Sequence, residues 1–297
     1  MEETSSGPRQ PRWRSFVTMI GAIALYALAT ALAIIITSNL PPMGPSASAA
    51  TKAAVTIILA WAVYKFGILR LGDRTRDDLP GNRFVIDAAL GLLIGGVLFG
   101  AIVGVAALLG VYRIVSCCST TNLISDLFIA AIMPGFMEEL FFRGILFRWT
   151  EEMLGSWMAL AMTSVLFGFA HAMNPNATLF SSTAIAIEAG ILLGGAYMLT
   201  RNLWLPIGLH AAWNFTQGYL FGIPVSGVAE EGMVRSTLSG SELVTGGGFG
   251  LEASVIAFVL ATAAGILFVW MAIRQQRVVP LPWGAGRALP HGGGSIL

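Results

Sequence analysis

The sequence predicts an all-α protein, a polytopic bundle of about eight transmembrane helices in the cell membrane. Hydrophobic residues make up 56% of the chain and charged residues only 11%, whereas about a quarter of the residues in a soluble domain are charged. The mean hydropathy is +0.76. Apolar runs also follow one another almost without interruption, and most approach the ~20 residues that cross the hydrocarbon core as a helix.

The expected spans are residues 16–37, 53–69, 84–111, 123–148, 157–174, 179–200, 203–222 and 251–273. Residues 1–15 then form an N-terminal tail, residues 16–273 the bundle, and residues 274–297 a tail whose prolines and glycines predict disorder. Residues 223–250 are rich in Gly and Ser and predict a flexible outer loop.

Basic residues favour one set of helix ends, which predicts the orientation of the bundle. With the N-terminus in the cytoplasm, the inner flanks carry Arg9, Arg12, Arg14, Arg70, Arg74, Arg76, Arg83, Arg148, Arg201, Arg274, Arg277 and Arg287. The outer flanks carry only Lys52, Arg113 and Arg235. We therefore expect both termini to be cytoplasmic. A cleaved signal peptide is the less favoured alternative for the first span, because its apolar core is longer than the ~7–15 residues of such signals. The basic residues are scattered at the ends of apolar runs, so the sequence does not indicate a nucleic-acid partner.

Small residues and cysteines are expected to be structural. Gly96, Gly100 and Gly104 share one face of the third span, and Gly190 and Gly194 share a face of the sixth. Such faces let helix backbones approach closely. The adjacent Cys117 and Cys118 are expected to remain unpaired loop residues, because adjacent cysteines rarely bond to each other.

Ionisable and amide residues inside the apolar spans point to chemistry within the membrane. They are Glu138, Glu139, Arg143, His171, His210 and Asn214. A charged side chain at the bilayer centre costs roughly 3 kcal/mol on insertion scales, so such residues usually face the bundle interior and serve a function. The chain has three histidines, and two of them belong to this set.

The spacing of the acidic residues predicts two roles. Glu139 and Arg143 are four residues apart with the acid first, the favourable order for an ion pair on a helix. Glu138 points about 100° away and presents a separate carboxylate to the bundle interior. Glu188, in the sixth span, belongs to no such pattern, and a structural hydrogen bond is as well supported for it as a role in a site.

The depths of these residues allow them to meet. At about 1.5 Å per residue from the inner ends of their spans, Glu138 lies roughly 15 Å deep, His171 about 21 Å, His210 about 10 Å and Asn214 about 16 Å. The fourth, fifth and seventh spans can therefore contribute to one buried pocket.

Three ordered motifs carry a resemblance to a known family. Residues Glu138 to Arg143 match EExxxR, Phe167 to His171 match FxxxH, and His210 to Asn214 match HxxxN. In this order they resemble the CAAX-protease and bacteriocin-processing (CPBP) family, which is related to the eukaryotic CAAX prenyl endopeptidase. The resemblance covers about residues 123–222, the expected catalytic core.

The resemblance implies an intramembrane endopeptidase. Glu138 and His171 would activate a water molecule, and His210 and Asn214 would stabilise the oxyanion. Glu139, Arg143 and Phe167 would support and shape the site. A positioned carboxylate suits general-base chemistry, and Asn or His donors suit a developing oxyanion. The implied substrate is a membrane-associated peptide or protein, with a CAAX-like or a leader sequence as candidates.

The need for a metal stays open at this stage. Members of the family have often been called metalloproteases, and zinc would then be held by Glu138, His171 and His210. The sequence contains no HExxH motif, and the separation of His171 from His210 matches no recognised ligand pattern. We therefore favour a glutamate-based mechanism without a cofactor and keep zinc as the alternative.

Other interpretations of the same residues remain. Glu139 and Arg143 are better explained as a structural ion pair than as direct catalysts, and membrane histidines often serve as interhelical hydrogen-bonding groups. A proton-coupled secondary transporter would also use buried Glu and His, but it should show inverted repeats, and we find no convincing repeat. A non-catalytic scaffold or immunity protein is the other alternative. The sequence does not predict an oligomeric state.

Overall fold

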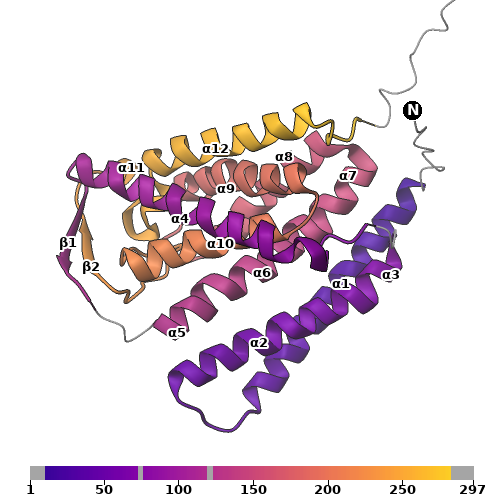
Figure 1. The fold of residues 1–297 in the computed structure, drawn as a ribbon, viewed down its shortest axis with the longest axis horizontal. Helices are drawn as coiled ribbons and strands as arrows, with labels where there is room; N and C mark the ends of the chain where they lie inside the picture. The colour runs from indigo at the N-terminus through magenta and orange to yellow at the C-terminus, as the bar shows by residue number, and fades with distance from the viewer. Residues whose placement is uncertain (1–10, 73–75, 119–122, 282–297) are drawn as a thin grey trace, which may run out of the picture.

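The computed structural model describes residues 11–72, 76–118 and 123–281. These residues are mostly helical, and they form a main bundle together with a long N-terminal hairpin that leans away from it (Figure 1). The hairpin consists of α1 (Arg12–Ser38) and α2 (Pro45–Val63), which pack along each other. A π-helical turn, Tyr64–Ile68, and α3 (Leu69–Leu71) extend α2.

Three long helices frame the main bundle: α4 (Phe84–Leu108), α9 (Leu179–Thr200) and α12 (Val255–Arg274). Between them lie α8 (Ser156–His171) and α10 (Trp204–Phe215), the latter continued by the π-helical segment Thr216–Leu220. α10 packs on α4, while α9 packs on both α8 and α12. The seventh expected span therefore lies against the third, and the sixth lies between the fifth and the last.

One continuous helical stretch runs from Leu123 to Leu154. It alternates between α-helix and π-helix through α5 (Leu123–Ser125), Asp126–Ile132, α6 (Met133–Glu139), Leu140–Phe147 and α7 (Arg148–Leu154). A π-helical segment thus begins directly after the two glutamates of the EExxxR motif. Such widened turns often mark functional sites in helices.

Short elements complete the described chain. β1 (Tyr112–Ser116) and β2 (Arg235–Leu238) pair antiparallel at one end of the bundle, on the left of Figure 1. α11 (Glu242–Thr245) and the 3-10 turns Gly247–Phe249 and Leu251–Ala253 precede α12, and a further 3-10 turn, Gly81–Arg83, precedes α4. The expected loop 223–250 therefore contains a strand and several turns.

The protein is a multi-pass integral membrane protein. Five helical segments of the described chain are long and apolar enough to cross a membrane: Arg12–Ser38, Pro45–Leu71, Gly81–Leu108, Leu179–Thr200 and Val255–Arg274. The other three expected spans are also helical, but α8 has 16 residues, and the fourth carries several charged side chains. A total of eight spans therefore stays a prediction.

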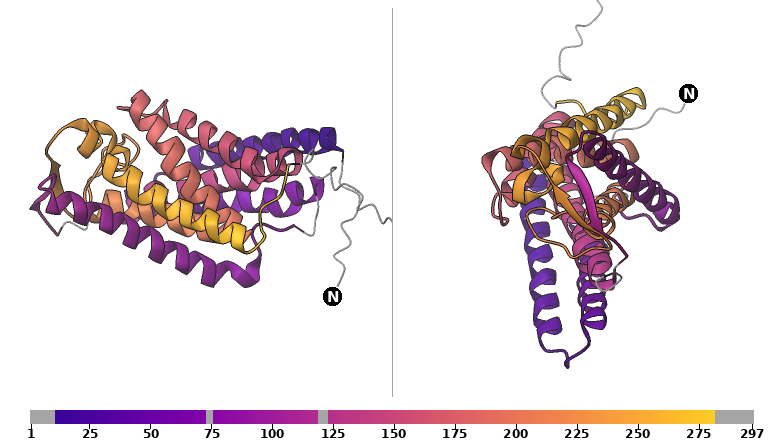
Figure 2. Two further views of the ribbon diagram at one scale, coloured as in Figure 1. Left: turned by 90° about the horizontal axis from the view of Figure 1, so that it is seen from above. Right: turned by 90° about the vertical axis from the view of Figure 1, so that its left-hand side faces the viewer.

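The N-terminal end of α1 and the C-terminal end of α12 lie at the same end of the bundle. Figures 1 and 2 place the start of α1 near the end of α12. The Ser15 hydroxyl donates to Glu152 of α7 at 3.2 Å, and the backbone N–H of Ser156 donates to the carbonyl of Val279 at 3.0 Å. The side of the membrane on which this end lies stays a prediction.

Glycines bring the central helices together, but not all at the expected positions. A Cβ atom added to Gly190 or Gly194 would collide with α8, so this face packs as predicted. The prediction for Gly100 and Gly104 is wrong, because a Cβ at either position would meet nothing within 4 Å. α4 instead approaches α10 through glycines one turn earlier, such as Gly95, where an added Cβ would overlap the carbonyl oxygen of Leu209.

A buried polar network joins the chain segments at the end where α1 begins. Arg148 donates to the Asp78 carboxylate at 2.9 Å, and the Tyr197 hydroxyl donates to the other oxygen of Asp78 at 2.9 Å. Arg201 and Arg76 donate to Glu151 at 2.7 and 3.1 Å. These contacts connect the segment before α4 with α7 and α9.

The prediction of unpaired adjacent cysteines is wrong for this structure. Cys117 and Cys118, which follow β1, have their sulfur atoms joined. Cys118 has φ 80°, in the left-handed region of backbone conformation. The bond therefore closes a tight local turn beside the two-stranded sheet.

Candidate active site

The two glutamates at the end of α6 point in different directions, as their positions on the helix predicted. The Glu139 side chain is completely buried, whereas the Glu138 side chain is 33% exposed. The Oε2 atom of Glu138 is buried and has no hydrogen-bond partner among the described residues. Glu138 therefore has a carboxylate oxygen available for a further hydrogen bond, at the edge of the bundle interior.

Glu139 connects two parts of the site. Its Oε1 atom accepts a hydrogen bond from Arg143 Nη1 at 2.9 Å, which is the predicted ion pair. The same oxygen lies 2.9 Å from His210 Nδ1. A carboxylate can only accept, so Nδ1 of His210 carries the hydrogen. Glu139 thus orients the His210 ring, a contact that the sequence did not predict.

His171 lies opposite Glu138, near the end of α8. Its Nδ1 atom is 2.8 Å from the backbone oxygen of Phe167, so Nδ1 donates, and Nε2 is left as the acceptor of the neutral ring. That Nε2 atom lies 3.9 Å from Glu138 Oε2. This distance is too long for a direct hydrogen bond and leaves room for a water molecule that contacts both atoms.

Phe167 packs against three members of the site. Its ring centroid is 4.5 Å from that of His171 and 6.2 Å from that of His210. The Arg143 guanidinium lies over the same ring, 4.8 Å from its centroid. Phe167 thereby packs between the Arg143 guanidinium and the His171 ring, and it forms part of the pocket wall.

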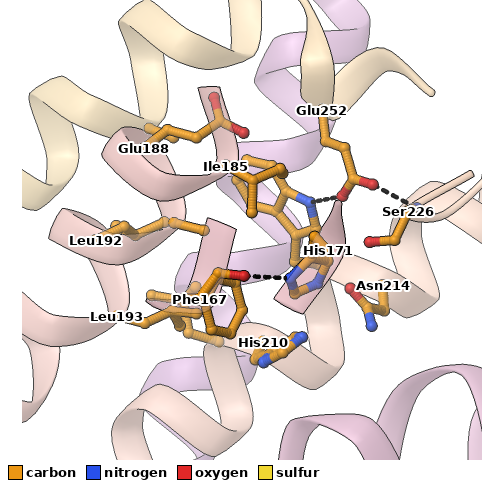
Figure 3. A pocket seen from close by; sticks show the side chains of 14 residues that line it. Phe167, His171, Ile185, Glu188, Leu192, Leu193, His210, Asn214, Ser226 and Glu252 are labelled. Atoms are coloured by element: carbon orange, nitrogen blue, oxygen red, sulfur yellow. Dashed lines mark hydrogen bonds between the residues drawn. The ribbon is translucent and has the colours of Figure 1, made fainter. Parts of the chain in front are cut away.

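His210 and Asn214 lie one turn apart on α10 and line the same cavity. Asn214 Nδ2 donates to the backbone oxygen of Ala130 at 3.0 Å, and this bond uses one of its two N–H groups. The cavity has a volume of about 30 Å³ and is shown in Figure 3. It is lined by Phe167, His171, Ile185, Glu188, Ala189, Leu192, Leu193, Leu209, His210, Trp213, Asn214, Ser226, Glu252 and Ala261. A space of this size holds one or two water molecules.

The structure brings the three motifs together from α6, α8 and α10. His171 and His210 face the cavity, and Glu138 approaches His171 Nε2 from outside its lining.

Two further carboxylates face the cavity. Glu188 of α9 is 1% exposed, and neither of its carboxylate oxygens has a hydrogen-bond partner among the described residues. Glu252, at the 3-10 turn before α12, was missed by the sequence reasoning. Its only signal was an acid between Leu251 and Ala253 at the edge of an apolar span.

The donor set expected for zinc does not fit a metal ion in this geometry. Glu138 Oε2 lies 3.9 Å from His171 Nε2, and Nδ1 of His210 is bonded to Glu139, so His210 could offer only Nε2 to a metal. Among residues 11–72, 76–118 and 123–281, no group of three or more His, Cys, Asp or Glu side chains is arranged to hold a metal. The chemistry of the site is therefore assigned to the side chains alone.

Fold and site together define the class: a multi-pass membrane protein with titratable side chains gathered between its helices. Residues 120–216 match the family model described as type II CAAX prenyl endopeptidase Rce1-like. The chain thus contains an Rce1-like domain over these residues, and this supports a protease of the CAAX type. No curated protein and no solved structure matches the chain.

Proposed function

We propose that this protein is an intramembrane endopeptidase that hydrolyses a peptide bond in a membrane-associated peptide or protein. The observation that carries the proposal is the 3.9 Å separation between His171 Nε2 and Glu138 Oε2, an oxygen without a hydrogen-bond partner among the described residues. The Rce1-like domain supports the same reaction class.

In this proposal the nucleophile is a water molecule held between Glu138 and His171. Glu138 accepts a proton as the water oxygen bonds to the scissile carbonyl carbon, and it later returns that proton to the leaving amine. His171 accepts the second water hydrogen bond through Nε2, because its Nδ1–H is committed to the Phe167 carbonyl. The two groups thereby orient the lone pair of the water.

The oxyanion of the tetrahedral intermediate is assigned to His210 and Asn214. Asn214 keeps one N–H free after its bond to Ala130. Because Nδ1 of His210 donates to Glu139, Nε2 can donate as well only when the ring is protonated. Glu139 stabilises that positive charge, and Arg143 holds Glu139 in place. Removing one oxyanion donor typically costs about a hundredfold in rate.

The substrate class follows from the surroundings of the site. Five helical segments of the described chain are long and apolar enough to cross a membrane, and the motif helices pack among them. The Glu138 side chain is more exposed than that of Glu139. A segment tethered to the bilayer reaches such a site more readily than a soluble protein does. Lipidated CAAX-like peptides and leader peptides are the candidates to compare.

The test is cleavage of fluorogenic lipidated and unlipidated peptides by the purified protein in nanodiscs. Glu138→Gln and His171→Ala are compared with the wild type and with Glu242→Gln, a control at an exposed glutamate of α11. Each is assayed with and without a chelator. Turnover that both site variants abolish, and that the control and the chelator spare, is the expected result. Full activity in both site variants would refute the assignment, and chelator-sensitive turnover restored by zinc would refute the metal-free mechanism.

A further inference from the structure

Glu252 is a buried carboxylate with two hydrogen-bond donors from different parts of the chain. The residue is 3% exposed. Trp213 Nε1–H donates to its Oε2 atom at 3.3 Å, and the backbone N–H of Ser226 donates to its Oε1 atom. Figure 3 shows both bonds at the rim of the cavity that His171 and Asn214 line. Glu252 therefore joins the α12 side of the bundle to two other segments.

The first of these segments carries the HxxxN motif. Trp213 lies on α10 between His210 and Asn214, directly before the asparagine. Its ring also packs edge-on against Phe99 of α4, with centroids 4.9 Å apart. Trp213 thus links Glu252 to the helix that carries both proposed oxyanion donors.

The second segment is a tight turn that covers the end of α8. Val225 and Val228 exchange backbone hydrogen bonds of 2.9 Å around Ser226 and Gly227. Gly227 has no room for a side chain, because an added Cβ would overlap the carbonyl oxygen of Pro175. Pro175 follows α8, which ends at His171. The turn is therefore seated next to the general-base side of the site.

We propose that Glu252 is a positioning residue of the active site, which holds Trp213 of α10 and the 225–228 turn in register with each other across the cavity. Glu252 acts through these two partners. This inference rests on the proposed function for its effect on turnover, but the positioning itself has an independent readout.

Loss of the carboxylate leaves two buried donors without partners, and a buried unpaired donor is costly enough to drive rearrangement. Glu252→Ala removes both acceptors. Glu252→Gln keeps the shape and one acceptor oxygen, but it turns an NH₂ group toward the other donor. We expect kcat to fall by about 10- to 100-fold in Glu252→Ala, as for other partners that orient reacting groups, with a smaller loss in Glu252→Gln. KM should change much less, because Glu252 does not touch the substrate.

The experiment combines hydrogen exchange with steady-state kinetics on the full-length protein in nanodiscs. The variants are Glu252→Ala, Glu252→Gln, Trp213→Phe and the Glu252→Ala/Trp213→Phe double variant, with Glu242→Gln as the matched control. Exchange of the backbone amides in peptides spanning residues 225–228 should accelerate in Glu252→Ala and stay unchanged in the control. Trp213→Phe should add little to the kcat loss in the Glu252→Ala background, because both changes remove the same contact between Glu252 and Trp213.

Two outcomes would overturn the inference. Unchanged exchange at residues 225–228 in folded Glu252→Ala would show that the carboxylate does not hold the turn. Losses in kcat that multiply in the double variant would show that Glu252 does not act through Trp213. If no peptide is cleaved by the wild type, the proposed function fails, and the exchange measurement still decides the positioning.

Discussion

Replacing Arg143 by methionine should destabilise the protein strongly, because the buried Glu139 carboxylate would lose its arginine partner and keep only its contact with His210. Both side chains of the ion pair are completely buried, and the Arg143 Nη1 to Glu139 Oε1 distance is 2.9 Å. Arg143 also donates to the Ala189 carbonyl at 3.3 Å and lies over the Phe167 ring. Removing one partner of such a buried pair costs about 3–5 kcal/mol.

The measurement is the free energy of reversible unfolding in detergent, monitored through tryptophan fluorescence. Glu139→Gln/Arg143→Met should recover part of the stability lost in Arg143→Met, because the neutral amide no longer requires a positive partner. Arg274→Met, at the exposed end of α12, is the control and should change stability by less than about 1 kcal/mol. A loss in Arg143→Met no larger than that of the control would refute the reasoning. So would a double variant that is no more stable than the single one.

Three other changes have defined outcomes. Gly208→Ala should lower the unfolding temperature, because the added Cβ would overlap a carbonyl oxygen of α4. Gly100→Ala is the control and should leave the unfolding temperature unchanged, because its Cβ would meet nothing within 4 Å. Equal unfolding temperatures in the two variants would contradict the close contact between α10 and α4. Burial is the main cause, and repulsion by the Asp126 carboxylate the second, that raises the pKa of Glu230 from 4.5 to about 7. The protonated form is thus favoured in the folded state, so its contribution to stability is complete below about pH 4.5 and is lost as the pH rises through about 7. Glu230→Gln should flatten the decline in unfolding temperature between pH 5 and pH 8, and an identical decline in both proteins would contradict the assignment. Asp78→Asn should lower the free energy of unfolding by about 3 kcal/mol, because it removes the negative charge that pairs with the completely buried Arg148. An unfolding curve like that of the wild type would disprove this prediction.

The motif residues were found from sequence because their chemistry conflicts with their surroundings. Glu138, His171 and Asn214 stand out in apolar spans, and four-residue spacing places motif partners on one helix face. The Glu139–Arg143 pair followed from the same periodicity. Local order along a helix was therefore enough to select these side chains.

The predictions that were wrong concern which helices meet and how closely. Gly100 and Gly104 share a face just as Gly190 and Gly194 do, yet only the second pair meets a neighbouring helix. A stripe of small residues permits close helix packing, but it does not determine which neighbouring helix packs against it. The joined sulfurs of Cys117 and Cys118 likewise depend on a backbone conformation that the residue types did not specify.

The sequence by itself determined that this is a membrane protein, that its apolar segments are helices, and which side chains carry the motifs. Each of these properties depends on composition and on the 3.6-residue period of a single helix. Only the tertiary structure decided that Glu139 bonds to His210, 71 residues away, and that Glu252 holds Trp213 from a different helix end. These contacts depend on the rotation and depth of one helix relative to another, and a one-dimensional pattern carries no record of either.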